Sequence, residues 1–148
     1  MIALLQRVSR GSVTIHNKPI SSVEYGYVVL LGILADDTPD DIKKIIPKIV
    51  HLRIMDDENG KMNRSILDTK GEILVVSQFT LCADVTQGRR PSYIQAMKPE
   101  EAKKMYDIFV EELKKTGVPV KTGEFGAMME VQIYNDGPVT ILIDSRNL

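Results

Sequence analysis

The most informative hydrophobic pattern in the chain lies at residues 73–81, which read ILVVSQFTL. The first four residues are all apolar, and a short β-branched run that follows a glycine is typical of a strand buried on both faces. Polar and aromatic residues come directly after it: Ser77, Gln78, Phe79 and Thr80. A buried strand is rigid and holds the groups just beyond its end accurately, so this stretch is a candidate substrate site. The same residues are equally consistent with the start of a turn.

Apolar runs and alternating positions predict further strands at both ends of the chain. The predicted strands cover residues 2–9, 12–16, 25–34, 131–134 and 139–144. The segment Asn135-Asp136-Gly137-Pro138 lies between the last two strands, and its composition predicts a tight turn. Only about 5–6% of X–Pro bonds in folded proteins are cis, so this composition alone predicts a trans peptide at Gly137–Pro138.

Helical periodicity is present in two stretches. Residues 38–50 carry a stripe of isoleucines, with Thr38 suited to cap the helix and Pro39 suited to its first position. Pro47 would remove a hydrogen bond from this helix at a cost of roughly 3 kcal/mol, so we expect a kink or an early end near residues 43–47. Residues 99–116 form the clearer helix, with glutamates in its first turn and lysines in its last.

Two amphipathic helices can cover only one face of one sheet, so the remaining strands must cover its other face with a second sheet. We therefore expect a mixed α/β fold. It would be a three-layer β/β/α sandwich with two barrel-like sheets and the two main helices on one side. The length of 148 residues, without a linker, repeat or low-complexity segment, predicts a single domain over residues 1–148.

Composition and charge narrow the classes of function. The formal net charge is −1, so any contact with RNA must come from a local patch. Cys82 is the only cysteine, which excludes an intrachain disulfide, and no Cys/His cluster indicates a metal site. No neighbouring histidine or lysine would activate the Cys82 thiol, so we expect a buried packing residue. The short apolar start is followed at once by Arg7 and Arg10, unlike a signal peptide or a membrane span, so we expect a cytoplasmic protein.

Three further segments offer candidate binding groups. Arg89 and Arg90 lie in a loop with glycine and proline, where they could hold a phosphate or simply be solvated. Arg7 could place a cation beside a pocket, although solvation or a backbone carbonyl partner is the more common state of such an arginine. The small apolar segment that contains Phe125 and Met129 could line a pocket or merely pack.

Five stretches together resemble the D-aminoacyl-tRNA deacylases: MIALLQRV at 1–8, GKMN at 60–63, VVSQFTL at 75–81, GRRPSY at 88–93 and NDGPVT at 135–140. The resemblance spans essentially the whole chain, and two separate motifs, SQFTL and NDGPVT, make it specific. The chain departs from the family pattern at Pro47, Cys82 and Tyr93, none of which touches the expected chemistry. The resemblance implies a hydrolase that cleaves the ester between a D-amino acid and the terminal ribose of tRNA, without a metal or a cofactor.

The family resemblance also implies a homodimer in which Gly137–Pro138, in cis, enters the pocket of the other subunit. Its main-chain carbonyls would face the α-amino group of the substrate, exclude the side chain of an L-residue and direct that of a D-residue toward solvent. Glycine escapes this filter, so glycyl-tRNA mischarged on tRNA(Ala) is implied as a second substrate. Arg7 resembles the arginine that supports the Gly–Pro element, and Ser77, Phe125 and Met129 would line the pocket.

Ester hydrolysis needs a nucleophile and hydrogen-bond donors for the tetrahedral oxyanion. The candidate donors are the N–H groups of Phe79 and Thr80, together with Gln78. Thr80 is the nucleophile by residue type, but the sequence offers no convincing base for its hydroxyl. In one version Thr80 attacks and forms an acyl-enzyme. In the other, which the missing base favours, water attacks with help from the ribose 2′-hydroxyl and Thr80 only positions groups.

Two other classes of function compete with the esterase. A non-catalytic tRNA-binding module on the same fold is consistent with the missing base. A threonine amidohydrolase that acts on free small molecules would form an acyl-Thr80 intermediate and would be indifferent to RNA. Turnover of D-aminoacyl-tRNA separates the esterase from the binding module.

Overall fold

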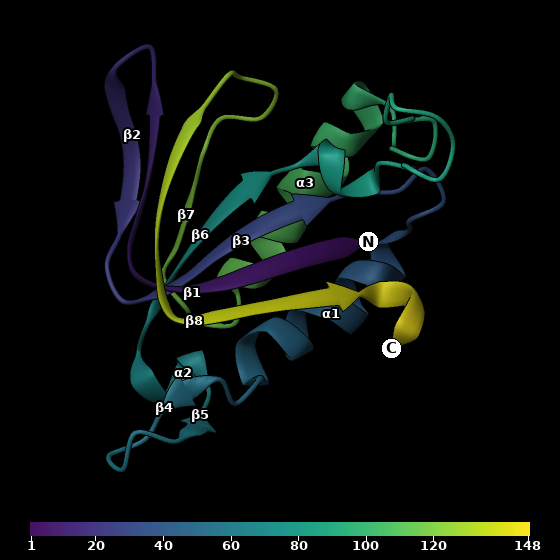
Figure 1. The fold of residues 1–148 in the computed structure, drawn as a ribbon. Coiled ribbons are helices and arrows are strands. Elements are labelled where there is room, and N and C mark those ends of the chain that lie inside the picture. Colours follow the sequence, from purple (N-terminus) through teal and green to yellow (C-terminus); the bar gives the residue numbers. More distant parts are fainter.

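The fold is organised around one long strand, β1, which pairs with three other strands. The computed structural model describes residues 1–148 and places six strands in one sheet: β1 (Ile2–Ile15), β2 (Lys18–Val23), β3 (Gly26–Gly32), β6 (Glu72–Ser77), β7 (Val120–Thr122) and β8 (Glu130–Asp144). The first half of β1 pairs with β3 and its second half with β2, while β8 pairs along the other edge. Because β1 changes partners along its length, the sheet curls into a nearly closed barrel (Figure 1).

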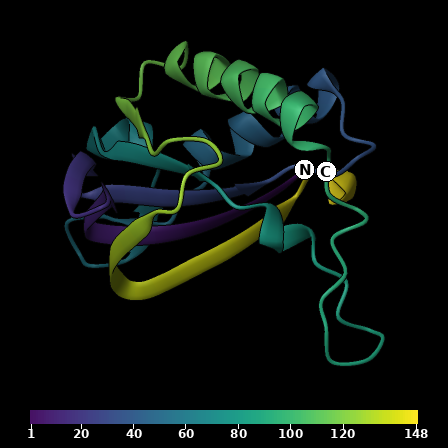
Figure 2. The ribbon, with the colours of Figure 1, turned by 90° about the horizontal axis from the view of Figure 1, so that it is seen from above.

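Two helices, α1 (Pro39–His51) and α3 (Pro99–Lys114), cover one face of this sheet, and β8 lies on the side away from them (Figure 2). The shorter elements are β4 (Met55–Asp56), β5 (Met62–Arg64), α2 (Ile66–Thr69), η1 (Phe79–Cys82) and η2 (Ser145–Asn147). The predicted mixed α/β, barrel-like fold is therefore confirmed. Its two main sheet layers are parts of one continuous sheet, and β4 and β5 form a separate small one.

Two apolar clusters fill the fold, and β6 contributes to both. The larger cluster, of 25 buried residues, combines side chains of α1 and α3 with Ile73 and Val75 of β6. The smaller one occupies the inside of the barrel and consists of Val8, Val13, Val23, Val28, Leu74 and Val76. Successive residues of β6 therefore face different clusters, which explains its unbroken apolar run. The predicted strand that is buried on both faces is confirmed.

Two pairs of predicted strands are single strands in the structure. The strands predicted at residues 2–9 and 12–16 are joined in β1. Those predicted at residues 131–134 and 139–144 are joined in β8. The expected tight turn at residues 135–138 is wrong, because both halves of β8 pair with β1 in the same direction. A tight turn would instead have reversed the chain and paired the two halves with each other.

The segment expected to turn forms an outward bulge of β8. Asn135 pairs with Val8 and Thr140 pairs with Gln6, so four residues of β8 stand opposite Arg7 alone. A bulge of this kind ends regular pairing locally and re-aims the side chains it carries. The hydrophobic pattern of the sequence does not predict this bulge.

The first helix also departs from expectation, because α1 continues through Pro47 to His51. The expected early end is therefore wrong. The buried stripe of α1 consists of Ile42, Ile45, Ile46, Ile49 and Val50, and its burial outweighs the bond that proline removes. Pro47 and Lys43, whose carbonyl loses that bond, are both exposed, so water can replace it. No helix of the chain is both long and apolar enough to span a membrane.

We expect Phe109→Ala to lower the free energy of unfolding by about 3–5 kcal/mol, because it removes a buried aromatic ring and leaves a cavity. Phe109 is 0% exposed, whereas the neighbouring Ile108 is 44% exposed. Ile108→Ala is therefore the matched control and should cost less than about 1 kcal/mol. Urea unfolding followed by circular dichroism gives both values, and equal losses would contradict the packing of α3 described above.

Candidate active site

The predicted Ser77–Thr80 segment lies at the edge of the sheet where three parallel strands end. β3, β6 and β7 run in the same direction and end at Gly32, Ser77 and Thr122. The edge formed by the carboxyl ends of parallel strands is where open α/β sheets bind their ligands. The segment is therefore placed as a candidate active site.

Close packing holds this segment against the buried end of β3. A Cβ atom added at Gly32 would lie 2.9 Å from the Leu81 Cβ and 3.2 Å from the Gln78 carbonyl oxygen, so the close approach requires glycine. The Gln78 N–H donates to the Leu31 carbonyl over 2.8 Å. These contacts fix the backbone from which the candidate donors project.

The side chains of Gln78 and Thr80 are hydrogen-bonded, with Gln78 Nε2 donating to Thr80 Oγ1. A side-chain amide does not take up a proton at neutral pH, so Gln78 is no general base for this hydroxyl. The first N–H groups of a helix have no partner within it, and Phe79 and Thr80 stand at the start of η1. Both residues are exposed. Two backbone donors beside an amide suit the stabilisation of a developing oxyanion.

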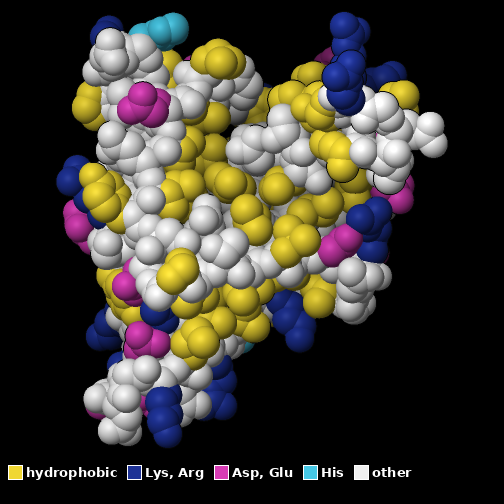
Figure 3. Space-filling view, viewed as in Figure 1, with side chains coloured by type: hydrophobic (Ala, Val, Ile, Leu, Met, Phe, Trp, Pro, Cys, Tyr) yellow, Lys and Arg dark blue, Asp and Glu magenta, His cyan; other side chains and the backbone are white.

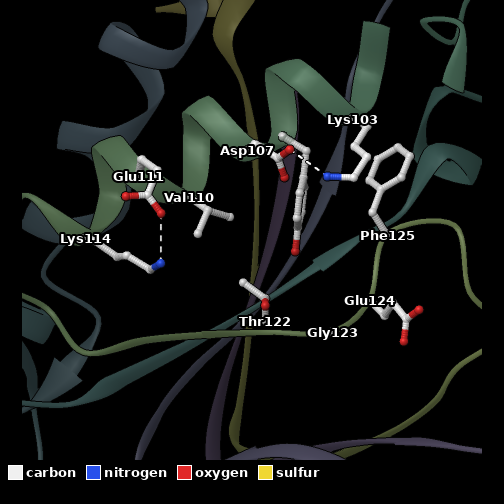
Figure 4. Close-up of a pocket in the computed structure, with 10 residues that line it drawn as sticks. Lys103, Asp107, Val110, Glu111, Lys114, Thr122, Gly123, Glu124 and Phe125 are labelled. Carbon is white, nitrogen blue, oxygen red and sulfur yellow. Dashed lines mark hydrogen bonds and ion pairs between the residues drawn. The ribbon is translucent and has the colours of Figure 1, made fainter. Parts of the chain in front are cut away.

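The loop that follows β7 brings Phe125 and Met129 to the same edge of the sheet, because β7 lies beside β6. Phe125 packs on Tyr106 of α3, with ring centroids 5.6 Å apart. It lines a groove of about 480 Å³ between α3 and residues 122–125 (Figure 4). The charged side chains on the α3 wall form two ion pairs, Lys103–Asp107 and Lys114–Glu111. Met129 instead packs against the cluster inside the barrel.

Arg7 is a buried cation behind the bulge of β8, and its two carboxylate partners are partly exposed. Its side chain is 5% exposed, and its Nη1 donates to the Ile54 carbonyl and to Asp56 Oδ1, each over 2.9 Å. Its Nε lies 3.1 Å from Asp136 Oδ2, and Asn135 Nδ2 donates to its carbonyl over 3.0 Å. A solvated Arg7 is therefore excluded. These contacts fix the two residues that lead into Gly137.

The Gly137–Pro138 peptide at the tip of the bulge is cis. The trans peptide predicted from turn composition is therefore wrong, and the cis form implied by the family resemblance is present. Gly137 has a φ of +119°, and a Cβ there would lie 2.7 Å from the Val139 side chain and 3.1 Å from Arg7 Nη2. This position consequently requires glycine. Both Gly137 and Pro138 are exposed, so the peptide is presented to the outside of the chain.

Within one chain, the Ser77–Thr80 segment and the Gly137–Pro138 bulge lie at opposite ends of β3. Ser77 pairs with Leu31 near the end of β3, whereas Arg7 pairs with Tyr27 near its start. Four residues of strand separate these positions by about 13 Å. The structure therefore brings Ser77, Gln78, Phe79 and Thr80 together with the Phe125 loop. It does not bring the Gly137–Pro138 bulge to that site in the same chain.

Cys82 takes no part in this arrangement. The thiol is buried and donates to the Ile33 carbonyl over 3.4 Å. Burial, with the nearby Asp37 carboxylate, raises the pKa of the Cys82 thiol, which therefore stays protonated at neutral pH. The expected packing role is confirmed.

Sequence reasoning misses the two carboxylates that accompany Arg7. Asp56 begins the acidic segment 56–58, and Asp136 lies in the Asn-Asp-Gly-Pro segment. The composition of each segment predicts only a turn. The available signal was an arginine inside a strand pattern. A buried arginine needs hydrogen-bond acceptors or carboxylates as partners, but its place in the sequence does not identify which residues supply them.

Comparisons with known proteins identify the family. The model of the D-Tyr-tRNA(Tyr) deacylase family matches residues 4–144. The D-aminoacyl-tRNA deacylase of Thermoanaerobacter sp. (strain X514) is 55% identical over 148 residues, which cover 100% of this chain and 99% of that protein. The protein of the same name from Aquifex aeolicus (strain VF5) is 52% identical over 148 residues and is covered completely, as is this chain.

A solved structure has the same fold and a related sequence. The c-Myc DNA Unwinding Element Binding Protein superimposes with a TM-score of 0.92 and 44% sequence identity, over 97% of this chain and 98% of that one. The family match and the curated relatives define a class of hydrolases that act on the ester bond of aminoacyl-tRNA. This chain belongs to the D-Tyr-tRNA(Tyr) deacylase family.

Proposed function

We propose that this protein hydrolyses the ester between a D-amino acid and the 3′-terminal ribose of tRNA. The observation that carries the proposal is the placement of the Ser77–Thr80 segment, with its helix-start N–H groups, at the carboxyl edge of three parallel strands. The substrate class is supported by relatives that are 55% and 52% identical and carry the name D-aminoacyl-tRNA deacylase.

In the proposed reaction an oxygen nucleophile attacks the ester carbonyl carbon. The oxyanion that forms accepts hydrogen bonds from the N–H groups of Phe79 and Thr80 and from the Gln78 amide. Collapse of the intermediate breaks the bond to the ribose oxygen and releases the D-amino acid and the tRNA. Because the only side chain bonded to the Thr80 hydroxyl is an amide, we assign the attack to water assisted by the ribose 2′-hydroxyl.

Rejection of L-residues is assigned to Gly137–Pro138 of the partner subunit in a homodimer. Main-chain atoms at this element would face the α-carbon of the substrate, so an L-side chain collides with them and a D-side chain points to solvent. Glycine carries no side chain, and glycyl-tRNA mischarged on tRNA(Ala) therefore passes the same filter. The exposure of Gly137 and Pro138 at the tip of the bulge supports this assignment.

Two observations support insertion into a second subunit rather than into the same chain. The bulge lies about 13 Å along β3 from the Ser77–Thr80 segment. The strand that carries it, β8, pairs only with β1, and hydrophobic side chains gather on the face where both lie (Figure 3). Tyr134 and Leu142 of β8 are 55% and 62% exposed, as expected for a surface that a partner covers.

A nucleic-acid-binding module without catalysis is the second candidate function. It is favoured by the name of the solved relative, c-Myc DNA Unwinding Element Binding Protein, which is 44% identical. The amide partner of Thr80, which supplies no base, is consistent with it as well. This candidate predicts binding of nucleic acid and no turnover of any aminoacyl ester.

The two candidates are separated by incubating the purified protein with matched D- and L-tyrosyl-tRNA in the presence of a chelator. We expect rapid loss of the D-ester, while the L-ester decays at its spontaneous rate. Equal cleavage of both esters would contradict the chiral filter, and cleavage of neither would leave only the binding module.

In the same assay we expect Pro138→Ala to raise cleavage of L-tyrosyl-tRNA by about tenfold or more, because loss of the ring that fixes φ at residue 138 loosens the main-chain wall that excludes L-residues. Pro19→Ala is the matched control, since Pro19 is exposed at the start of β2, outside the bulge. Unchanged rejection of the L-ester by Pro138→Ala would contradict the proposed role of the bulge.

We expect Thr80→Ala to keep kcat for D-tyrosyl-tRNA within about tenfold of the unaltered value, because water rather than Thr80 attacks the ester. Thr80→Ser, which retains the hydroxyl, is the conservative control. A loss of more than about a thousandfold in Thr80→Ala, with folding and tRNA binding intact and Thr80→Ser active, would assign the attack to Thr80.

A further inference from the structure

A loop between η1 and α3 projects from the body of the protein (Figure 2). We call residues 85–91 the basic arm. The arm is closed at its base by Asp84 and Ser92, whose backbones exchange two hydrogen bonds of 2.8 Å each. At its tip, Gly88 has a φ of +66° and no neighbouring atom within 4 Å of an added Cβ, so the tip is open to solvent.

The basic arm carries two arginines whose charges the chain does not neutralise. Arg89 and Arg90 are both exposed, and neither makes an ion pair. The nearest acidic residue in sequence, Asp84, is engaged elsewhere, because its carboxylate accepts hydrogen bonds from the Thr86 N–H and hydroxyl over 2.9 and 2.7 Å. Basic side chains accordingly project at the end of the molecule where this loop lies (Figure 3).

The base of the arm is attached to the candidate active site. The Tyr93 ring meets the Phe79 ring edge-on, with centroids 5.1 Å apart and an interplanar angle of 67°. Phe79 supplies one of the proposed oxyanion donors, so the arm and that donor share a packing contact. Five residues of chain from Asp84 to Arg89 extend at most about 17 Å. The arm is therefore long enough to carry the arginines to backbone phosphates that lie a short distance from the reacting ester.

We propose that Arg89 and Arg90 bind phosphate groups of the tRNA strand that leads to the reacting ester, and thereby hold the tRNA beside η1. A guanidinium group binds two phosphate oxygens in a planar fork, which suits it to this contact. The formal net charge of −1 gives the protein no general attraction for RNA, so such a local pair must supply it. This inference rests on the proposed function, because it names the surface that holds the same substrate.

The test compares the double variant Arg89→Gln/Arg90→Gln with the control Lys44→Gln/Lys104→Gln. The control removes two exposed cations from α1 and α3 and changes the net charge equally. With D-tyrosyl-tRNA we expect the arm variant to raise KM about tenfold and to leave kcat within about twofold, since binding is lost and chemistry is not. With the D-tyrosyl ester of adenosine, which has no phosphates, kcat/KM should not change.

Salt dependence of tRNA binding gives a second readout that does not need turnover. A phosphate contact on a single strand contributes a slope of about −0.7 to the logarithm of affinity against the logarithm of salt concentration. Loss of two contacts should therefore make the slope for deacylated tRNA, which carries no amino acid, shallower by about 1.4 in the arm variant. The control should keep the slope of the unaltered protein.

Several results would overturn the inference. The first is an equal loss of kcat/KM on D-tyrosyl-tRNA and on the adenosine ester in the arm variant. The second is a salt slope that stays the same in the arm variant. The third is a rise in KM of the same size in the lysine control variant. A change in molecular mass by light scattering would show instead that the arm contacts a second copy of the chain. If the unaltered protein cleaves neither ester, the proposed function fails, while the salt slope still decides whether the arm binds RNA.

Discussion

A buried arginine is the interaction on which the rest of this structure depends. Arg7 sits within β1, where it joins three segments that are far apart in the sequence: its own strand, the Ile54–Asp56 segment and the bulge of β8. A buried guanidinium is tolerated only with partners, and those of Arg7 are the Ile54 carbonyl and two carboxylates that are 39% and 40% exposed. These contacts, together with the hydrogen bonds from Asn135 to the Arg7 and Val139 carbonyls, hold the backbone on either side of Gly137 while the cis peptide stays exposed.

This constraint places two rigid features at opposite ends of one sheet. The Ser77–Thr80 segment is held by the packed ends of parallel strands, and Gly137–Pro138 is held by the contacts of Arg7. Groups on such elements keep their geometry better than groups on free loops, as a site that discriminates stereochemistry needs. Because the two features do not meet within a chain, the proposed homodimer would bring Gly137–Pro138 of each chain to the Ser77–Thr80 segment of the other.

The sequence was informative where one physical effect dominated. Apolar runs and amphipathic stripes identified β6 and α3 because burial of those residues decides their structure. Prediction failed where a distant interaction overrode local preference. Pro47 stays helical because the isoleucine stripe is buried beside it, and the Asn-Asp-Gly-Pro segment bulges because both halves of β8 pair with β1. The partners of Arg7 could not be predicted, since they lie 47 to 129 residues away along the chain.

Mixed dimers test most directly the proposal that Gly137–Pro138 of one subunit completes the site of the other. Phe79→Pro removes one proposed oxyanion donor at a helix position that accepts proline, whereas Pro138→Ala leaves the donors intact. In a mixed dimer purified through two different affinity tags, the site with intact Phe79 belongs to the Pro138→Ala chain. We expect that site to cleave D-tyrosyl-tRNA and to reject L-tyrosyl-tRNA, because it receives an unaltered Gly137–Pro138 from the other subunit. Cleavage of the L-ester at the rate of the Pro138→Ala homodimer, counted per site with intact Phe79, would contradict this proposal.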